Sequence, residues 1–219
     1  MTEIMKQNEI KNVTGSIIHI LHGTASYRGV LASIRGAASF NSPRAQPAWP
    51  IIMKALREDL LGRNGQPSYA ENAVYSALRM YAIHQQGSDE FVYGPIDYKD
   101  DSNSESEIKD DEKPEPGIEI FTALGELRHN EDLEVALDRR VRQTLSTTDI
   151  NSVVNSLNHL VGIIKSKKLK IKIDYAKLAQ DLYWFQMSYE SANSVRLSWG
   201  QQYYGNVAKK AEEKGEKND

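Results

Sequence analysis

Apolar residues recur every three or four positions along nearly the whole chain, and this spacing restricts the possible fold more than any other feature. Between 131 and 166 the recurring residues are Leu133, Leu137, Val141, Leu145, Ile150, Val153, Leu157 and Leu160. This period gives a helix one apolar face, whereas a strand needs alternation. With 219 residues and 40% apolar composition, the chain can also bury a sizeable core. The sequence therefore predicts an all-α protein.

Breaks in the period divide the chain into about nine amphipathic helices. The expected helices cover 8–22, 25–38, 48–61, 68–86, 118–129, 131–146, 149–166, 174–190 and 192–210. Pro50 suits a first helical turn, and Ser68 with Glu71 forms a capping box. Asp174 is placed to cap the helix that follows it. These signals at the helix ends agree with the spacing of the apolar residues.

A polar stretch rich in Asp, Glu, Ser and Lys interrupts the helical pattern. We expect an acidic flexible loop or linker over 91–117, because this composition buries too little apolar surface to order itself. The loop would separate an N-terminal helical lobe over 1–90 from a basic C-terminal lobe over 118–210, with a charged tail over 211–219. The two lobes could still share one core.

The net charge of −3 averages two opposite surfaces. Between 136 and 210 there are 12 basic against 5 acidic residues, a net of +7, whereas 97–117 has 3 against 9, a net of −6. A local concentration of positive charge attracts phosphate groups whatever the total charge of the protein. The distribution therefore favours a nucleic-acid partner.

Composition and motifs exclude several other classes of protein. The chain has no apolar run long enough to span a membrane and no signal-peptide pattern, so we expect it in the cytoplasm. The absence of cysteine excludes disulfides, thiolate zinc sites and cysteine nucleophiles. Phosphate-binding loops, dinucleotide fingerprints and nucleophile elbows are absent too. We therefore expect no cofactor and no enzymatic activity.

Two groups of residues superficially suggest metal chemistry. His19 and His22 are three positions apart on an expected helix, but a zinc site needs at least three protein ligands and no third is evident. Asp97 with Glu107 and Lys109 is similar to the carboxylate-and-lysine arrangement of magnesium-dependent nucleases. Such a site needs rigid strands, and this Ser- and Asp-rich stretch has no strand pattern. A nuclease is thus a remote alternative.

Arginines on two expected helices could contact a nucleic-acid backbone. Arg28 and Arg35 lie two turns apart, about 10.5 Å along one flank of their helix, so both could reach one strand. Arg139 lies opposite the apolar face of its helix, with Arg140 and Arg142 on the two flanks. No flat surface engages all three. Ordinary solvated arginines remain the alternative for Arg28 and Arg35, and one of the other three could bind a neighbour instead.

A run of lysines follows the helix expected over 149–166. Lys168, Lys170 and Lys172 alternate with apolar residues, so an extended segment would project all three to one side, close to Lys165. Such a track could hold a nucleic-acid backbone without reading its sequence. The alternative is a solubilising or edge-protecting run.

Aromatic residues gather late in the sequence, at Tyr183, Trp184, Phe185, Tyr189, Trp199, Tyr203 and Tyr204. Aromatic rings can stack on unpaired bases, but the helical spacing favours the core for most of them. Arg196 with Trp199 and Tyr203 could instead form an interaction edge.

Five segments, at 27–36, 117–125, 139–145, 173–184 and 196–204, occur in an order that resembles the CasB family, the small subunit of the type I-E CRISPR complex Cascade. The resemblance covers most of the chain apart from the acidic stretch and the tail. It implies an all-helical, non-enzymatic subunit that pairs head to tail with a second copy. It also implies contacts with the repeated backbone subunits that hold the guide RNA, and with the large subunit. The basic surface would stabilise the R-loop by holding the displaced DNA strand and helping to seat the target strand.

The basic contacts of the family fall best on Arg35, Arg139 and Arg140, with Arg28, Arg142 and Arg196 as less secure positions. Gly36, Asn158 and His159 stand where related sequences can have basic residues. We expect the lysines at 165–172 to supply the missing charge and the acidic stretch to face away from nucleic acid. A purely structural scaffold, whose arginines bind only other subunits, is the second interpretation.

Overall fold

The computed structural model describes residues 8–96 and 116–215, and these residues are almost entirely helical, which confirms the predicted class. The α-helices are α2 (Glu9–Gly23), α3 (Arg28–Gly36), α4 (Trp49–Ala55), α5 (Tyr69–Gln85), α6 (Ile120–Leu127), α7 (Glu131–Ser146), α8 (Ile150–Ser166), α9 (Tyr175–Phe185) and α10 (Tyr189–Gly215). The 3-10 helices are η1 (Ala25–Tyr27), η2 (Pro43–Ala48) and η3 (Glu58–Leu60). No helix in the described ranges is long and apolar enough to cross a membrane.

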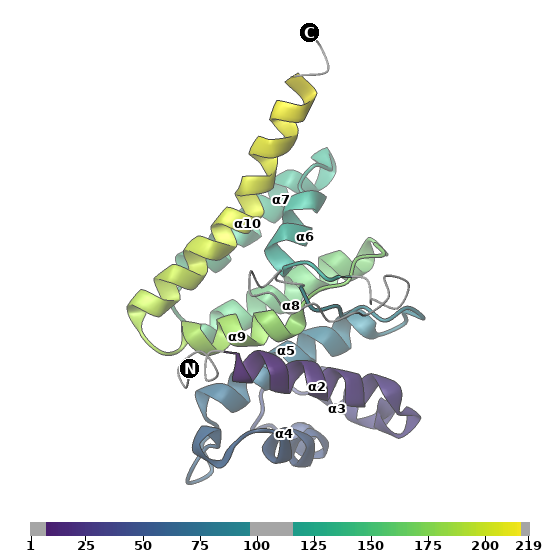
Figure 1. The fold of residues 1–219 in the computed structure, drawn as a ribbon, viewed down its shortest axis with the longest axis vertical. Coiled ribbons are helices and arrows are strands. Elements are labelled where there is room, and N and C mark those ends of the chain that lie inside the picture. Colours follow the sequence, from purple (N-terminus) through teal and green to yellow (C-terminus); the bar gives the residue numbers. More distant parts are fainter. Residues whose placement is uncertain (1–7, 97–115, 216–219) are drawn as a thin grey trace, which may run out of the picture.

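The helices form two layers (Figure 1). In one layer α3, α5, α8 and α7 follow one another side by side. In the other, α2, α9 and α10 pack across the first, with α9 against α5 and α6 between α10 and α8. The last turns of α10 extend beyond the rest of the protein (Figure 1). We call the side of the first layer that faces away from α2 and α9 the outer face.

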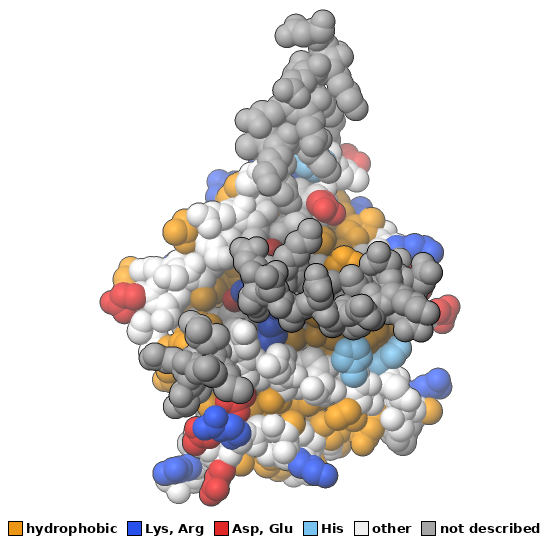
Figure 2. Space-filling model, viewed as in Figure 1, with side chains coloured by type: hydrophobic (Ala, Val, Ile, Leu, Met, Phe, Trp, Pro, Cys, Tyr) orange, Lys and Arg blue, Asp and Glu red, His pale blue; other side chains and the backbone are white. Residues whose placement is uncertain are grey.

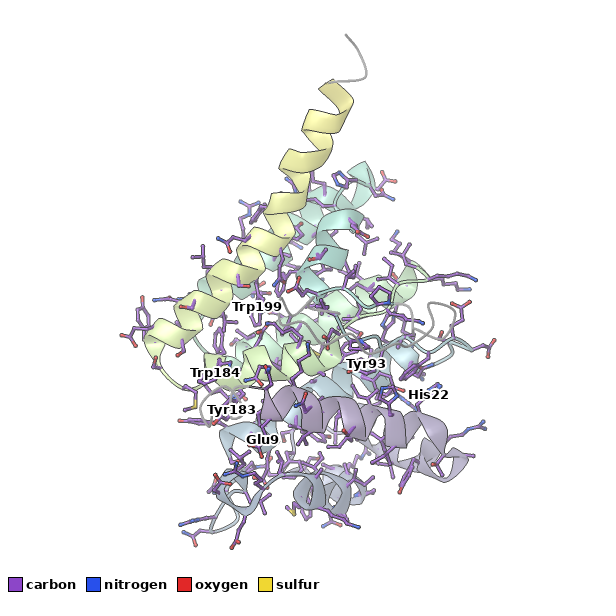
Figure 3. The ribbon with its side chains drawn as sticks, viewed as in Figure 1. Glu9, His22, Tyr93, Tyr183, Trp184 and Trp199 are labelled. Carbon is purple, nitrogen blue, oxygen red and sulfur yellow. The ribbon has the colours of Figure 1, made fainter. Side chains whose placement is uncertain are left out.

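Apolar side chains from both predicted lobes form a single core. Trp199 of α10 belongs to that core, since only 1% of its surface is exposed (Figure 3). Its ring stacks on Phe121 and Phe185 with centroid distances of 4.9 and 6.0 Å, and its Nε1 donates to Asp181 Oδ2 at 3.0 Å. Aromatic rings contribute large buried areas, and the indole N–H is satisfied here as burial requires.

The predicted helix ends are confirmed at three positions. Glu71 N donates to the hydroxyl of Ser68 at 3.0 Å, and the Glu71 carboxylate accepts from Ser68 N at 2.8 Å, which completes the capping box. Asp174 accepts from Lys177 N at 2.8 Å and caps α9. Pro50 lies in the first turn of α4.

Two predicted boundaries are wrong. The helix expected over 48–61 ends at Ala55, because Leu56 turns to an extended conformation in which its side chain is buried. The chain also breaks after Phe185 rather than after 190. Here the hydroxyl of Ser188 accepts from Ser191 N at 3.1 Å, which starts α10 earlier than the apolar period indicates.

The described ends of the polar stretch expected over 91–117, residues 91–96 and 116–117, belong to no helix and contact other parts of the chain. Tyr93 is buried, and both Tyr93 and Ile118 form parallel bridges with Ile173. Gly117 N donates to the carbonyl of Pro95 at 3.0 Å. Gly117 has to be glycine, since a Cβ there would lie 1.9 Å from the carbonyl oxygen of the neighbouring chain segment. Residues 97–115, which carry most of the acidic charge, lie outside the described part of the chain.

Replacing Trp199 with alanine should lower the free energy of unfolding by about 3–5 kcal/mol, because the change opens a cavity between two stacked rings. Urea denaturation followed by circular dichroism measures this loss. Leu197→Ala is the matched control, since Leu197 lies on the same helix and is 64% exposed, and its effect should stay within about 0.5 kcal/mol. Equal losses in both variants would contradict the placement of Trp199 in the core.

Candidate nucleic-acid interface

Three of the four helices of the outer face, α3, α5 and α8, carry almost no negative charge, whereas α7 has four acidic residues. In α3, α5 and α8 the one acidic residue is Glu71, which is buried and occupied in the capping box. The segment 24–57, which includes α3, has five basic and no acidic residues. By contrast, the opposite side of the molecule shows basic and acidic side chains intermixed (Figure 2). The outer face is therefore the strongest candidate for contact with a polyanion.

The fold brings together two of the predicted basic residues that are distant in sequence. Lys165 at the end of α8 donates from Nζ to Gln86 Oε1 at 2.9 Å. Partial burial lowers the pKa of Lys165, and the nearby positive charge of Arg35 lowers it further. Lys165 in turn lies close to His84, whose pKa falls to about 4, mainly through burial and also through this charge. Like charges are thus crowded where α3, α5 and α8 meet.

Arg140 lines a groove of about 470 Å³ between α7 and α8. The other lining residues are Gln143, Ser146, Thr147, Ser152, Asn155, Ser156 and His159. Every one of them can form hydrogen bonds and none is acidic, which suits phosphate and sugar groups. Asn158 does not line it, since its Nδ2 donates back to the carbonyl of Val154 at 2.8 Å. Of the three positions that depart from the family pattern, Gly36, Asn158 and His159, only His159 lines this groove.

The sequence predicts an extended segment from Lys168, but Lys167 and Lys168 form a turn after α8, with Lys168 at a φ of 49°, and only the residues after Lys168 can follow the predicted course. Ile173 is buried and the segment before it is partly packed on the core, while Lys168 and Lys170 are exposed. Lys170 Nζ, however, pairs with Glu90 Oε1 at 2.8 Å, and Lys168 lines a hollow that also includes Asp89. Acidic residues partly neutralise this track, and the same hollow includes Lys165 and Glu90.

The remaining predicted arginines differ in their surroundings. Arg28 and Arg139 are exposed. Arg142 is exposed too, but its Nε donates to the carbonyl of Asp138 at 3.3 Å. Arg196 donates from Nη1 to the carbonyl of Leu145 at 3.2 Å and so holds α10 against the end of α7. This internal bond gives Arg196 a structural role, whereas binding by the other three stays a prediction.

Two basic residues of this region were missed by the sequence analysis. Arg79 lies on α5 between the neighbouring α3 and α8, and its buried Nε has no hydrogen-bond partner in the described part of the chain. Arg44 places its guanidinium 3.9 Å from where a Cβ on Gly36 would stand. The absence of acidic residues over 24–57 could have pointed to Arg44. No sequence signal marks Arg79, because it stands among the apolar residues of a central helix.

The histidines named as candidate metal ligands, His19 and His22, pack against aromatic rings. His22 packs on Phe91 with ring centroids 4.1 Å apart, and His19 contacts both Phe91 and Tyr93 (Figure 3). Among the described residues, no three His, Asp or Glu side chains gather as they would around a metal ion. Asp97, Glu107 and Lys109 of the nuclease-like arrangement lie outside the described ranges.

Comparison with known proteins gives a consistent match to one family. The family model described as "CRISPR-associated protein Cse2" matches residues 30–204. The crystal structure of CasB from Thermobifida fusca is similar in fold, with a TM-score of 0.61 and 21% identity over 89% of this chain and 95% of that one. A Cse2-family CRISPR-associated protein from Thermus thermophilus gives a TM-score of 0.59 and 18% identity over 89% and 97%. No curated protein sequence matches the chain.

Replacing Lys165 with glutamine should raise the pKa of His84, because it removes a positive charge that disfavours the imidazolium ion. An NMR titration of the imidazole measures the shift, with wild-type His84 titrating near pH 4. Unfolded His84 takes up its proton near pH 6.5, so the stability of the folded state should decrease as the pH falls from about 6.5 to about 4. Lys54→Gln on α4 is the control. An unchanged His84 in the Lys165 variant would contradict their proximity.

Proposed function

Because this chain belongs to the CRISPR-associated Cse2 (CasB) family, whose members are subunits of the Cascade complex, we propose that its outer face binds nucleic-acid strands without reading their sequence. In this role the subunit stabilises the R-loop by holding the displaced DNA strand and helping to seat the target strand against the guide RNA. The observation that carries the proposal is the basic face of α3, α5 and α8, on which no exposed acidic side chain occurs among the described residues.

The electrostatics of this face support the proposal. Crowded cations such as Arg35 and Lys165 repel each other, and a phosphate backbone placed across them relieves this repulsion. The groove beside Arg140 adds neutral hydrogen-bond donors and acceptors for phosphate and sugar oxygens. R-loop formation exchanges one duplex for another of similar stability, so a few such contacts suffice to shift the balance.

The proposed partners within the complex are a second copy of the chain arranged head to tail, the repeated backbone subunits with their guide RNA, and the large subunit. Such a complex would act in the cytoplasm. Arg196, which donates to the carbonyl of Leu145, contributes to this assembly indirectly by holding α10 against the end of α7.

We propose no catalytic step. Magnesium-dependent cleavage of DNA that is lost on replacing Asp97, Glu107 and Lys109 would overturn this part of the proposal. Cleavage that survives these replacements would indicate a contaminating nuclease.

Replacing Arg28 and Arg35 together with alanine should weaken binding of labelled single-stranded DNA. It should also reduce the slope of log affinity against log salt concentration by about 2, because about one counterion fewer is released per lost phosphate contact. Fluorescence anisotropy over a salt series, with the isolated protein and with the assembled complex, measures both quantities. Lys168, Lys170 and Lys172 replaced together should have a smaller effect per charge, since Glu90 already pairs with Lys170.

The matched control replaces Lys54 and Arg63 with alanine, which removes the same charge as the arginine pair from α4 and the loop before α5. Each variant should unfold within about 0.5 kcal/mol per surface charge of the wild type. If the arginine pair and the control give equal slopes in the complex, the basic residues do not bind DNA, and the scaffold interpretation takes the place of this proposal.

A further inference from the structure

One cation of the outer face has a buried donor nitrogen that the protein itself does not satisfy. Arg79 lies on α5, with α3 on one side and α8 on the other. Its Nε is buried and meets no hydrogen-bond acceptor among the described residues. Nearly all buried polar groups in proteins are hydrogen-bonded, so an unsatisfied one indicates a missing water, ion or ligand. A guanidinium nitrogen can only donate, and the missing group must therefore be an acceptor.

The surroundings of Arg79 are fixed by two hydrogen bonds of α5. One turn before Arg79, the hydroxyl of Tyr75 donates to the carbonyl of Ala37 at 3.1 Å, which places the end of α3, with Arg35, against α5. Burial raises the pKa of Tyr75 to about 12, and the charge of Arg79 partly opposes this rise, so the guanidinium lies close to that hydroxyl. Two turns after Arg79, Gln86 accepts from Lys165 of α8. Cations from three helices thus border the same stretch of α5.

The helices around Arg79 offer no free carboxylate. The one acidic residue of α3, α5 and α8 is Glu71, whose carboxylate is already bound to Ser68 N and Gly62 N. Gln86 Oε1 is used by Lys165, and the acidic residues that line the hollow beside Lys165, Asp89 and Glu90, belong to the loop after α5. A buried, unpaired guanidinium nitrogen with two further cations in its surroundings is suited to an oxyanion with several acceptor atoms, which a guanidinium can bind through two nitrogens.

We propose that Arg79, Arg35 and Lys165 form a discrete site for one phosphate group of a nucleic-acid strand, with Arg79 as its buried anchor. This inference rests on the proposed function for the identity of the strand, but the anion site itself does not depend on it. The site differs from the exposed lysine run, where side chains in water bind the backbone diffusely. It fixes the position of one phosphodiester against the α3–α5–α8 layer, from which the rest of the strand can continue toward the groove at Arg140.

The site can be tested by NMR on the full-length protein, because arginine Nε–H groups give their own signals. The probe is inorganic phosphate, titrated at constant ionic strength. The Arg79 signal is identified by its loss in Arg79→Lys, and the Arg35 signal by its loss in Arg35→Gln. We expect a saturable shift of both signals in the wild type, with affinity about tenfold weaker in Lys165→Gln, since one charge-assisted contact is removed. Arg63, exposed on the loop before α5, serves as the internal control.

Shifts that are linear and equal for Arg79 and Arg63 would overturn the site, as would an Arg79 signal that does not move. Lys165→Gln and Arg35→Gln leave Arg79 in place, so the binding measurement itself uses no Arg79 variant, and Arg79→Lys serves only to assign the signal. A short oligothymidine, added next, separates this inference from the proposed function. If the Arg79 signal shifts saturably with phosphate but does not respond to the oligonucleotide, the anion site is supported and a nucleic acid as its ligand is excluded. If DNA binding depends on Arg28 and Arg140 but the Arg79 signal does not move, the proposed function is supported and the phosphate site at Arg79 is excluded.

Discussion

The buried carboxylate of Asp174 holds together three parts of the chain on which the rest of the structure depends. It caps α9 through Lys177 N, accepts from Ile96 N at 2.9 Å, and pairs with Lys11 Nζ of α2 at 3.4 Å. Burying a charge is costly unless it is paired and hydrogen-bonded, and these partners meet that condition only when the three segments are in register. The junction therefore holds the start of α9 against α2 and against the segment that ends at Ile96.

This arrangement separates two electrostatic roles. Carboxylates that stabilise the fold, such as Asp174 and Asp138, lie in the junction and between helices, where each has a cationic or hydrogen-bonding partner. The outer face of α3, α5 and α8 has no such carboxylates among its described residues and leaves Arg35 and Lys165 to repel each other. Mutual repulsion of this kind disfavours the isolated fold slightly, and it is tolerated where a polyanionic partner compensates for it. The stability of the fold therefore rests on the paired charges, and the proposed binding on the unpaired ones.

The sequence predicts the helices and their caps well, because apolar period and capping chemistry are local properties. It also identifies the basic residues that are exposed, such as Arg28 and Arg139. It fails where tertiary contacts override a local signal, as at Leu56, whose burial ends α4 early, and at Tyr93, which enters the core from a polar stretch. The groove at Arg140 and the position of Arg79 depend on which helices become neighbours, and the pairing of α5 with α3 and α8 cannot be read from periodicity.

The geometry of the outer face is consistent with binding that does not depend on the base sequence of the nucleic acid. Proteins that read bases commonly insert a helix or strand into a groove, so that a few side chains reach base edges. Here the helices lie side by side in a layer, and basic residues such as Arg28 and Arg139 are exposed on them. Such a surface can meet the backbone of a strand at successive phosphates but presents no element that enters a groove. A subunit built in this way suits a complex in which base pairing with a guide supplies the specificity, because the protein then needs only to hold whichever strand the guide has separated.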